Sequence, residues 1–173
     1  HMPLLTVITP CYNEEATVHY FYNELVKYLP EIDAEVEILF VNDGSKDKTV
    51  EKCLEIKEKD DRVKIINFSR NFGKEIAMMA GLDYAQGDAV IFIDADLQDP
   101  PELIPDMLKL WEDGNEVIYG KRKSREGESA FKLFTAKMFY KTLNALSDVE
   151  IPKDTGDFRL VDRKVVDTIN SLP

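Results

Sequence analysis

Apolar, β-branched runs alternate along this chain with amphipathic segments, and this alternation limits the folds open to it. Five runs are candidate strands: LLTVIT at 4–9, VEILFVN at 36–42, VKIINF at 63–68, AVIFIDA at 89–95 and EVIYG at 116–120. Between them, amphipathic helices are predicted at about residues 15–29, 46–59, 74–86 and 101–113. Strands and helices alternate in this way when helical crossovers join parallel strands. The first 120 residues are therefore predicted to form an α/β domain, with a mostly parallel sheet flanked by helices on both faces.

The pattern changes after residue 120. A basic loop, KRKSREGES, precedes an apolar-rich helix predicted at about residues 129–146, and the segment KDTGDFRLVDRKVVDTI follows. The aromatic residues and lysines of that helix fit either an anionic membrane surface or packing against the sheet. No Gly-, Ser- or Pro-rich linker separates this part, so residues 1–173 are expected to form a single domain.

Composition excludes some classes of partner. The 33 acidic and 22 basic residues give a formal net charge of −11, which is opposite to what nucleic-acid binding needs. Cys11 and Cys53 lack metal-ligand spacing, so a reduced, cytoplasmic setting is expected. The longest apolar runs, about seven residues, are far too short to span a bilayer. The opening His1-Met2 is typical of a cloning remnant, and we expect a membrane-associated part beyond Pro173.

Polar clusters follow each predicted strand at the point where the strand ends. The stretches are TPCYNEE, VNDGSKDKT, SRNFGKE, DADLQDPP and YGKRKSR, in chain order. In an open parallel sheet, ligands bind outside the carboxyl ends of the strands. The sequence therefore predicts one ligand site, assembled from these five loops.

Two carboxylates directly after the fourth strand indicate a cation. Asp94 and Asp96 are two residues apart, so a turn at Ala95 brings both side chains towards one point. Their mutual repulsion needs a neutralising charge, and hard oxygen ligands suit Mg²⁺ or Mn²⁺, which share their remaining positions with substrate phosphates. The alternative is that these acids cap the helix near Pro101, a role we expect for Asp99.

Basic residues supply the complement to an anionic ligand. Lys74 follows Gly73 at a predicted helix start, and Arg70 and Arg122 stand at strand ends. Any one of them alone is more often a solvated surface charge. The chain has neither a P-loop nor a dinucleotide fingerprint, so an NTPase or a dehydrogenase finds no support.

These motifs, in this order, resemble those of family 2 glycosyltransferases, which have the Rossmann-like GT-A fold. The matching stretches are TPCYNEE, VNDGSKDKT, NFGKEIAMMAGLDYA, DADLQDPPE, YGKR and DTGDFRLVDR. The nearest branch transfers a sugar from a nucleotide to a polyprenyl phosphate, as dolichol-phosphate mannose synthase does. The resemblance implies an inverting, metal-dependent enzyme with a UDP- or GDP-linked donor and a lipid-phosphate acceptor. It also implies a full-length protein at the cytoplasmic face of the membrane.

The resemblance assigns the first two clusters to the nucleoside. Pro10, Tyr12, Asn13 and Glu14 correspond to the loop around the nucleotide base, and Asp43 corresponds to the acid that contacts base or ribose. An aromatic ring beside hydrogen-bonding groups suits a nucleoside pocket. Tyr12 is alternatively a half-buried packing residue.

The resemblance also identifies the metal ligands. Asp94, Ala95 and Asp96 correspond to the family's DxD motif. Asp96 and Gln98 are implied as direct ligands of Mg²⁺ or Mn²⁺, with Asp94 nearer the ribose or the sugar. Such a metal offsets the charge that develops on the departing nucleoside diphosphate.

Four further positions complete the implied site. Lys74 and Arg122 correspond to positions near the nucleotide and its diphosphate. Asp157 corresponds to the presumed catalytic base, although it could instead position the sugar or an acceptor that is already ionised. Arg159 would share a face with Asp157 in an extended segment, and could pair with it or with the acceptor phosphate.

Two other functions are compatible with the same residues. A magnesium-dependent phosphatase or phosphotransferase would use Asp94 as nucleophile and Asp96 as acid. A nucleotide-sugar sensor would keep the pocket but perform no transfer, and Asp157 would then be idle.

Overall fold

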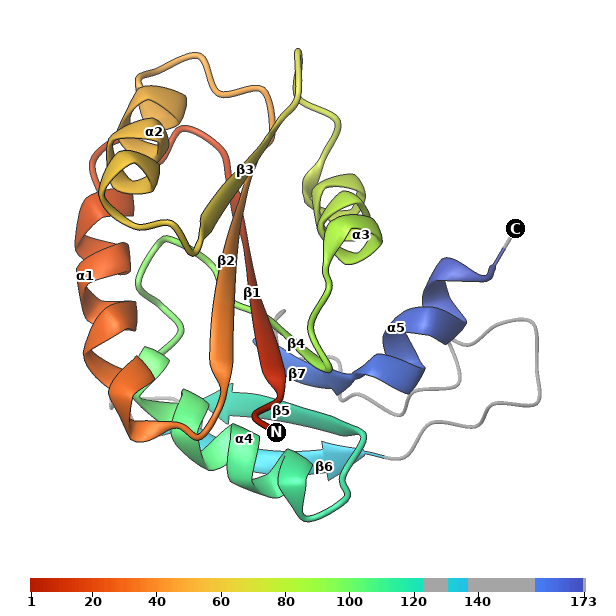
Figure 1. The fold of residues 1–173 in the computed structure, drawn as a ribbon. Coiled ribbons are helices and arrows are strands. Elements are labelled where there is room, and N and C mark those ends of the chain that lie inside the picture. The colour runs from red at the N-terminus through yellow and green to blue at the C-terminus, as the bar shows by residue number, and fades with distance from the viewer. Residues whose placement is uncertain (123–130, 137–157, 173) are drawn as a thin grey trace.

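A computed structural model describes residues 1–122, 131–136 and 158–172 (Figure 1). In these residues seven strands form one sheet in the order β3-β2-β1-β4-β7-β5-β6. The strands are β1 (Leu4–Cys11), β2 (Glu35–Asn42), β3 (Val63–Asn67), β4 (Ala89–Phe92), β5 (Val117–Arg122), β6 (Phe131–Ala136) and β7 (Arg159–Asp162). The helices are α1 (Val18–Tyr28), α2 (Thr49–Lys59), α3 (Lys74–Tyr84), α4 (Ile104–Glu112) and α5 (Arg163–Asn170), with short 3₁₀ turns at Leu29–Glu31 and Pro101–Leu103.

The sheet has two parts. Strands β1 to β4 form the first part and pair in parallel, and strands β5 to β7 form the second part. Strand β1 pairs with β2 and β4, and β2 pairs with β3, all in parallel. Strand β7 lies between β4 and β5 and is antiparallel to both, and β6 is antiparallel to β5. The predicted mostly parallel α/β fold is confirmed, with its five strands and four helices within a few residues of the expected positions.

Helices cover both faces of the sheet (Figure 1). One core is formed with α1, α2 and α4 and includes Phe21, Ile56 and Met107. The other is formed with α3 and α5 and includes Leu82 and Val166. Because β2 is covered on both sides, its four residues 38–41 are all buried, which explains the unbroken apolar run there.

The helix predicted at residues 129–146 is wrong over residues 131–136. These residues form β6, which pairs with β5 along six positions from Val117↔Ala136 to Arg122↔Phe131. Pairing satisfies the backbone groups along the outer edge of β5, and Phe134 stacks on Tyr119 with ring centroids 5.5 Å apart. The helix was predicted from the apolar and basic residues of the whole segment 129–146, but strand pairing decides the structure at residues 131–136. Residues 137–146 lie outside the described residues.

Strand β7 was not predicted, although it joins the two parts of the sheet. Leu160 and Val161 are buried in it, and Arg159 pairs with Phe92 on one side and with Tyr119 on the other. Helix α5 follows at once, capped by the Asp162 carboxylate, which accepts a hydrogen bond from the backbone nitrogen of Lys164 at 2.8 Å.

Among the described residues, no helix is both long enough and apolar enough to cross a membrane.

Candidate functional site

A hollow of about 150 Å³ opens at the C-terminal ends of β1, β2 and β4, beside the start of α3. It is lined by Pro10, Cys11, Tyr12, Glu14, Asp43, Lys74, Asp94, Ala95 and Asp96. All of these except Cys11 are predicted nucleotide-sugar residues. They come from separate parts of the chain and meet because parallel strands bring their carboxyl ends to one edge of the sheet.

The loop after β1 is held by the loop after β2. Asn13 adopts a left-handed φ of 54°; its backbone nitrogen donates to Ser45 Oγ at 3.0 Å, and its Oδ1 accepts from the backbone nitrogen of Lys46 at 2.8 Å. The backbone nitrogen of Glu14 donates to Thr49 Oγ1 at 2.8 Å. Asn13 thus joins two loops beside the hollow, whereas Tyr12, 43% exposed, lines the hollow itself.

Asp43 has a structural function that the sequence did not reveal. Its carboxylate is buried, and accepts hydrogen bonds from the backbone nitrogens of Phe72 (2.7 Å) and Gly73 (3.1 Å) and from Asn71 Nδ2 (3.1 Å). The carboxylate therefore fixes the loop that leads into α3, as well as lining the hollow.

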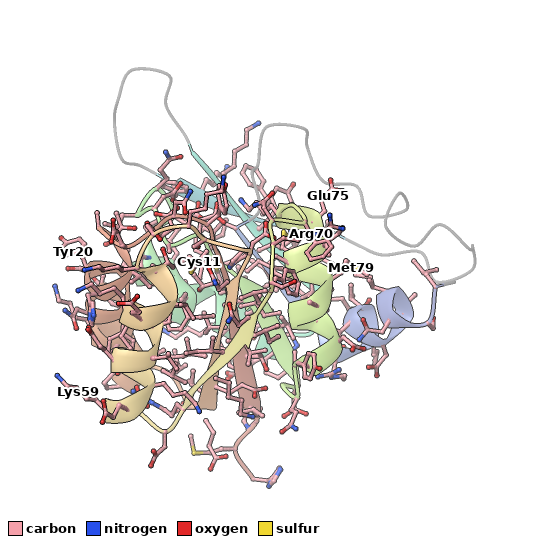
Figure 2. The ribbon with its side chains drawn as sticks, turned by 90° about the horizontal axis from the view of Figure 1, so that it is seen from above. Cys11, Tyr20, Lys59, Arg70, Glu75 and Met79 are labelled. Atoms are coloured by element: carbon pink, nitrogen blue, oxygen red, sulfur yellow. The ribbon has the colours of Figure 1, made fainter. Side chains whose placement is uncertain are left out.

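Gly44 lets that loop approach the end of β2. Its φ is +69°, and a Cβ added there would lie 2.1 Å from the carbonyl carbon of Arg70. Only glycine tolerates both the dihedral angle and this close backbone contact. The Arg70 guanidinium stacks over the Phe72 ring, 4.5 Å from its centroid, near the start of α3, where Figure 2 labels Arg70 beside Glu75.

The loop after β4 carries the two acids of the DxD motif. Asp94 Oδ2 forms an ion pair with Lys74 Nζ at 2.7 Å. Asp96 Oδ1 accepts a hydrogen bond from the backbone nitrogen of Gln98 at 3.2 Å, and Leu97 between them has a left-handed φ of 68°. Asp96 and Gln98 are both exposed, so both side chains are accessible to a bound ion.

The expectation that Asp99 caps the following helix is wrong. The 3₁₀ turn at Pro101–Leu103 has no side-chain cap, because Asp99 Oδ2 instead accepts a hydrogen bond from the backbone nitrogen of Asp94 at 3.2 Å. Burial raises the pKa of Asp99 to about 6, and the charges of Asp94 and Asp96 act in the same direction. The Asp99 carboxylate thus connects the two ends of the loop at residues 94–99.

The oxygen ligands of this loop suit a divalent ion whose coordination is completed by the phosphates of a substrate. Among the described residues, no group of three or more His, Cys, Asp or Glu side chains could hold a metal ion. Asp96 and Gln98 offer hard oxygen atoms in an exposed loop, and Mg²⁺ is commonly held by one or two carboxylates together with substrate phosphates and water. The residues present therefore fit Mg²⁺ or Mn²⁺ bound together with a diphosphate.

The remaining predicted site residues lie in the second part of the sheet or outside the described residues. Arg159 is half-buried in β7, opposite Phe92. Arg122 ends β5, opposite Phe131. Asp157 lies outside the described residues, so its role stays a prediction.

Sequence reasoning missed Cys11 as a lining residue. It is buried, and a hydrogen bond with Cys53 together with burial raises the pKa of its thiol. Both cysteines are free and buried. Strand alternation alone gave no signal that Cys11 borders the hollow, because that depends on the turn after β1.

Comparison with known proteins places this chain in a family. Residues 6–169 match the model described as Glycosyl transferase family 2. An uncharacterized glycosyltransferase of Bacillus subtilis, YkcC, is 53% identical over 96% of this chain and 52% of its own length. The bactoprenol glucosyl transferase of Shigella phage SfV is 43% identical over 98% of this chain and 55% of its own length. The chain thus spans about half the length of the curated relatives that it matches.

A solved structure supports the fold. A mannosyltransferase of Pyrobaculum calidifontis, determined in complex with GDP-Man and Mn²⁺, has a TM-score of 0.71 against this chain at 22% identity. The similarity covers 100% of this chain and 48% of that one. At this identity the likeness concerns the fold alone.

Proposed function

Because this chain belongs to glycosyl transferase family 2, we propose that its hollow binds a nucleotide-activated sugar and that the enzyme transfers the sugar, with inversion, to a polyprenyl phosphate. The relatives about twice its length include a bactoprenol glucosyl transferase, which supports a lipid-phosphate acceptor. We further propose that the full-length protein acts at the cytoplasmic face of the membrane.

One observation supports the proposed binding site for the nucleotide-sugar donor. The aromatic ring of Tyr12, the acids Asp94 and Asp96, and the ammonium of Lys74 line the same hollow although they come from three different loops. An aromatic ring suits a base, and acids that bind a cation together with a lysine suit a diphosphate. A nucleoside diphosphate is the ligand that needs these three kinds of group together.

The side chains have separate functions in the proposed transfer. Tyr12 and Asp43 bind the nucleoside, while Asp96 and Gln98 hold the divalent ion. When bound, that ion stabilises the charge that grows on the departing diphosphate, a contribution of several kcal/mol. An acceptor phosphate oxygen then attacks the anomeric carbon from the face opposite the diphosphate, which inverts the configuration.

Asp157 is proposed to orient the acceptor rather than to remove a proton. A phosphate ester is already largely ionised at neutral pH, so little deprotonation is needed. Arg159, in the antiparallel strand beside β4, is proposed to bind the acceptor phosphate, because a guanidinium can form two parallel hydrogen bonds with it.

Calorimetric titration tests the donor site. Wild-type protein is titrated with UDP, GDP and their sugar conjugates, with Mn²⁺ and with chelator. One base series should bind in the micromolar range with Mn²⁺ and at least about tenfold more weakly with chelator. Asp113→Asn, an exposed acid after α4, serves as a control for loss of a carboxylate and should bind as wild type does. Metal-independent binding of every nucleotide, or no binding at all, would contradict the proposal.

Replacing Asp157 by Asn in the full-length protein separates the enzyme from a non-catalytic sensor. Unchanged donor affinity with transfer reduced on the order of 100-fold is the expected result, because a misplaced acceptor reacts that much more slowly. Unchanged transfer would remove Asp157 from the mechanism.

A further inference from the structure

The hollow is strongly anionic for a site that would receive an anion. Its described lining residues include four carboxylates, those of Glu14, Asp43, Asp94 and Asp96, and one cationic side chain, Lys74. A nucleoside diphosphate brings further negative charge. Like charges a few ångströms apart near a protein surface repel by several times the thermal energy, so the balance of cations in the hollow affects which ligands can bind.

Lys74 occupies an unfavourable place for a lysine. It is the first residue of α3, where the positive end of the helix dipole disfavours a cation. Gly73, with a φ of 104° and its backbone nitrogen bound to Asp43, fixes this helix start beside the hollow. From there the Lys74 side chain reaches the Asp94 carboxylate, with Nζ 2.7 Å from Oδ2.

This ion pair joins Lys74, which the resemblance places near the diphosphate, to Asp94 of the DxD motif. Asp94 is one-quarter exposed and Lys74 is 43% exposed by side chain, so an incoming ligand can reach both groups. A divalent ion near Asp94 would stand close to the Lys74 ammonium, and two cations at that separation repel each other.

We propose that Lys74 neutralises Asp94 while no metal ion is bound by Asp96 and Gln98, and thereby makes the metal ion and the donor bind together. Without the donor, the ammonium neutralises Asp94 and opposes entry of a free ion. In the presence of a metal–diphosphate, Asp94 would no longer need the Lys74 ammonium, and Lys74 would be available to bind the diphosphate. This inference rests on the proposed function, because it assumes that the hollow receives a nucleoside diphosphate.

The proposal predicts opposite effects of one substitution on two ligands. In Lys74→Gln, the ammonium is lost while hydrogen-bonding capacity remains. Affinity for Mn²⁺ alone should rise at least about tenfold, since the repelling charge is gone, whereas affinity for UDP or GDP in saturating Mn²⁺ should fall about tenfold. A role in fold stability alone would not strengthen the binding of one ligand and weaken that of the other.

Two further variants control the experiment. Lys74→Arg keeps the positive charge, so it should not show the gain in affinity for Mn²⁺ alone that Lys74→Gln shows. Lys59→Gln makes the same charge change at the exposed end of α2, which Figure 2 shows on the opposite side of the molecule from Arg70 and Glu75. It should leave both affinities unchanged. Free Mn²⁺ is measured by electron paramagnetic resonance, and nucleotides are measured by calorimetry.

The outcomes distinguish this inference from the proposed function. If Lys74→Gln binds Mn²⁺ alone no better than wild type, or if neither protein binds it, the inference is overturned, whatever the nucleotides do. If Lys74→Gln gains Mn²⁺ affinity while the wild type binds neither UDP nor GDP, the cation exchange at Asp94 stands, but the proposed donor site fails.

Discussion

The two parts of the sheet position their site residues in different ways. Around β1 to β4, neighbouring loops hold one another through side-chain hydrogen bonds, as Asp43 does with the backbone of residues 72–73. In β5 to β7, strand pairing sets the positions, as for Arg159 between Phe92 and Tyr119. The first part carries most of the proposed donor site, and the second carries Arg159 and Arg122.

This difference indicates that donor binding and transfer are separable. The loops after β1, β2 and β3, which hold one another through hydrogen bonds, are called the interlocked loops here. Changes to them should directly affect the affinity for the donor, because these loops line the hollow. Changes in the antiparallel strands should affect the acceptor side and leave the hollow in place. Four substitutions test this separation, beginning with the largest expected effect.

Asp96→Asn should weaken the metal site most. An amide oxygen is neutral and binds a divalent ion less strongly than a carboxylate, so transfer by the full-length protein should fall roughly 100- to 1000-fold. Donor affinity in Mn²⁺ should fall to the value measured with chelator. Radiometric transfer assays and calorimetry measure the two effects. Wild-type affinity in this variant would show that the metal is held elsewhere.

Gly44→Ala should break the interlocked loops. The positive φ and the overlap with the backbone of Arg70 and Asn71 together should cost roughly 3 kcal/mol of unfolding free energy, and should weaken donor binding as the loop moves. Gly114→Ala is the matched control, because its φ is +102° but nothing lies within 4 Å of the added methyl group. It should lose only about 1–2 kcal/mol and bind the donor normally. Urea denaturation compares the two variants.

Gly120→Ala tests the antiparallel part. An added Cβ would lie 2.9 Å from Phe158 Cδ2, and this buried ring must shift, at a cost of about 1–2 kcal/mol. Transfer should fall while donor affinity stays within about twofold of wild type, measured as for Asp96→Asn. A loss of donor affinity as large as that of Gly44→Ala would contradict the separation.

Asp60→Asn should have the smallest effect, confined to stability. Hydrogen bonds from Arg62, assisted by Tyr22, hold the pKa of Asp60 well below its usual range. A lowered carboxyl pKa stabilises the fold above the unfolded pKa of about 4, and this contribution is lost as the pH falls below that value. The variant should therefore lose about 1–2 kcal/mol at pH 7, and the gap to wild type should narrow below about pH 4.

Thermal unfolding from pH 7 to pH 3 measures that gap. Asp61→Asn changes the exposed neighbour and should match wild type throughout. Donor affinity should be unchanged in both variants, because Asp60 does not line the hollow. A constant gap across this pH range would mean that the charge of Asp60 contributes nothing.

The sequence predicted the features that depend on local pattern. Alternating apolar runs and amphipathic segments set the order of β1 to α4, and the polar clusters at the strand ends predicted most of the hollow. The pattern failed where long-range pairing decides the structure. Residues 131–136 were predicted as part of a longer amphipathic helix but form β6, and the short segment at residues 159–162 becomes an interior strand.

Individual contacts within the site also depended on tertiary structure. Asp99 was expected at a helix start, but its carboxylate bonds to the backbone of Asp94. Nothing in the residue pattern indicated that Asp43 would hold the loop at 71–73, or that Lys74 would reach Asp94. The sequence by itself determined which chemical groups are available and at which edge of the sheet they gather, because strand direction follows from the alternation of elements. Which group bonds to which was decided by the folded loops, because a hydrogen bond or ion pair requires distances of about 3 Å that only the packed chain sets.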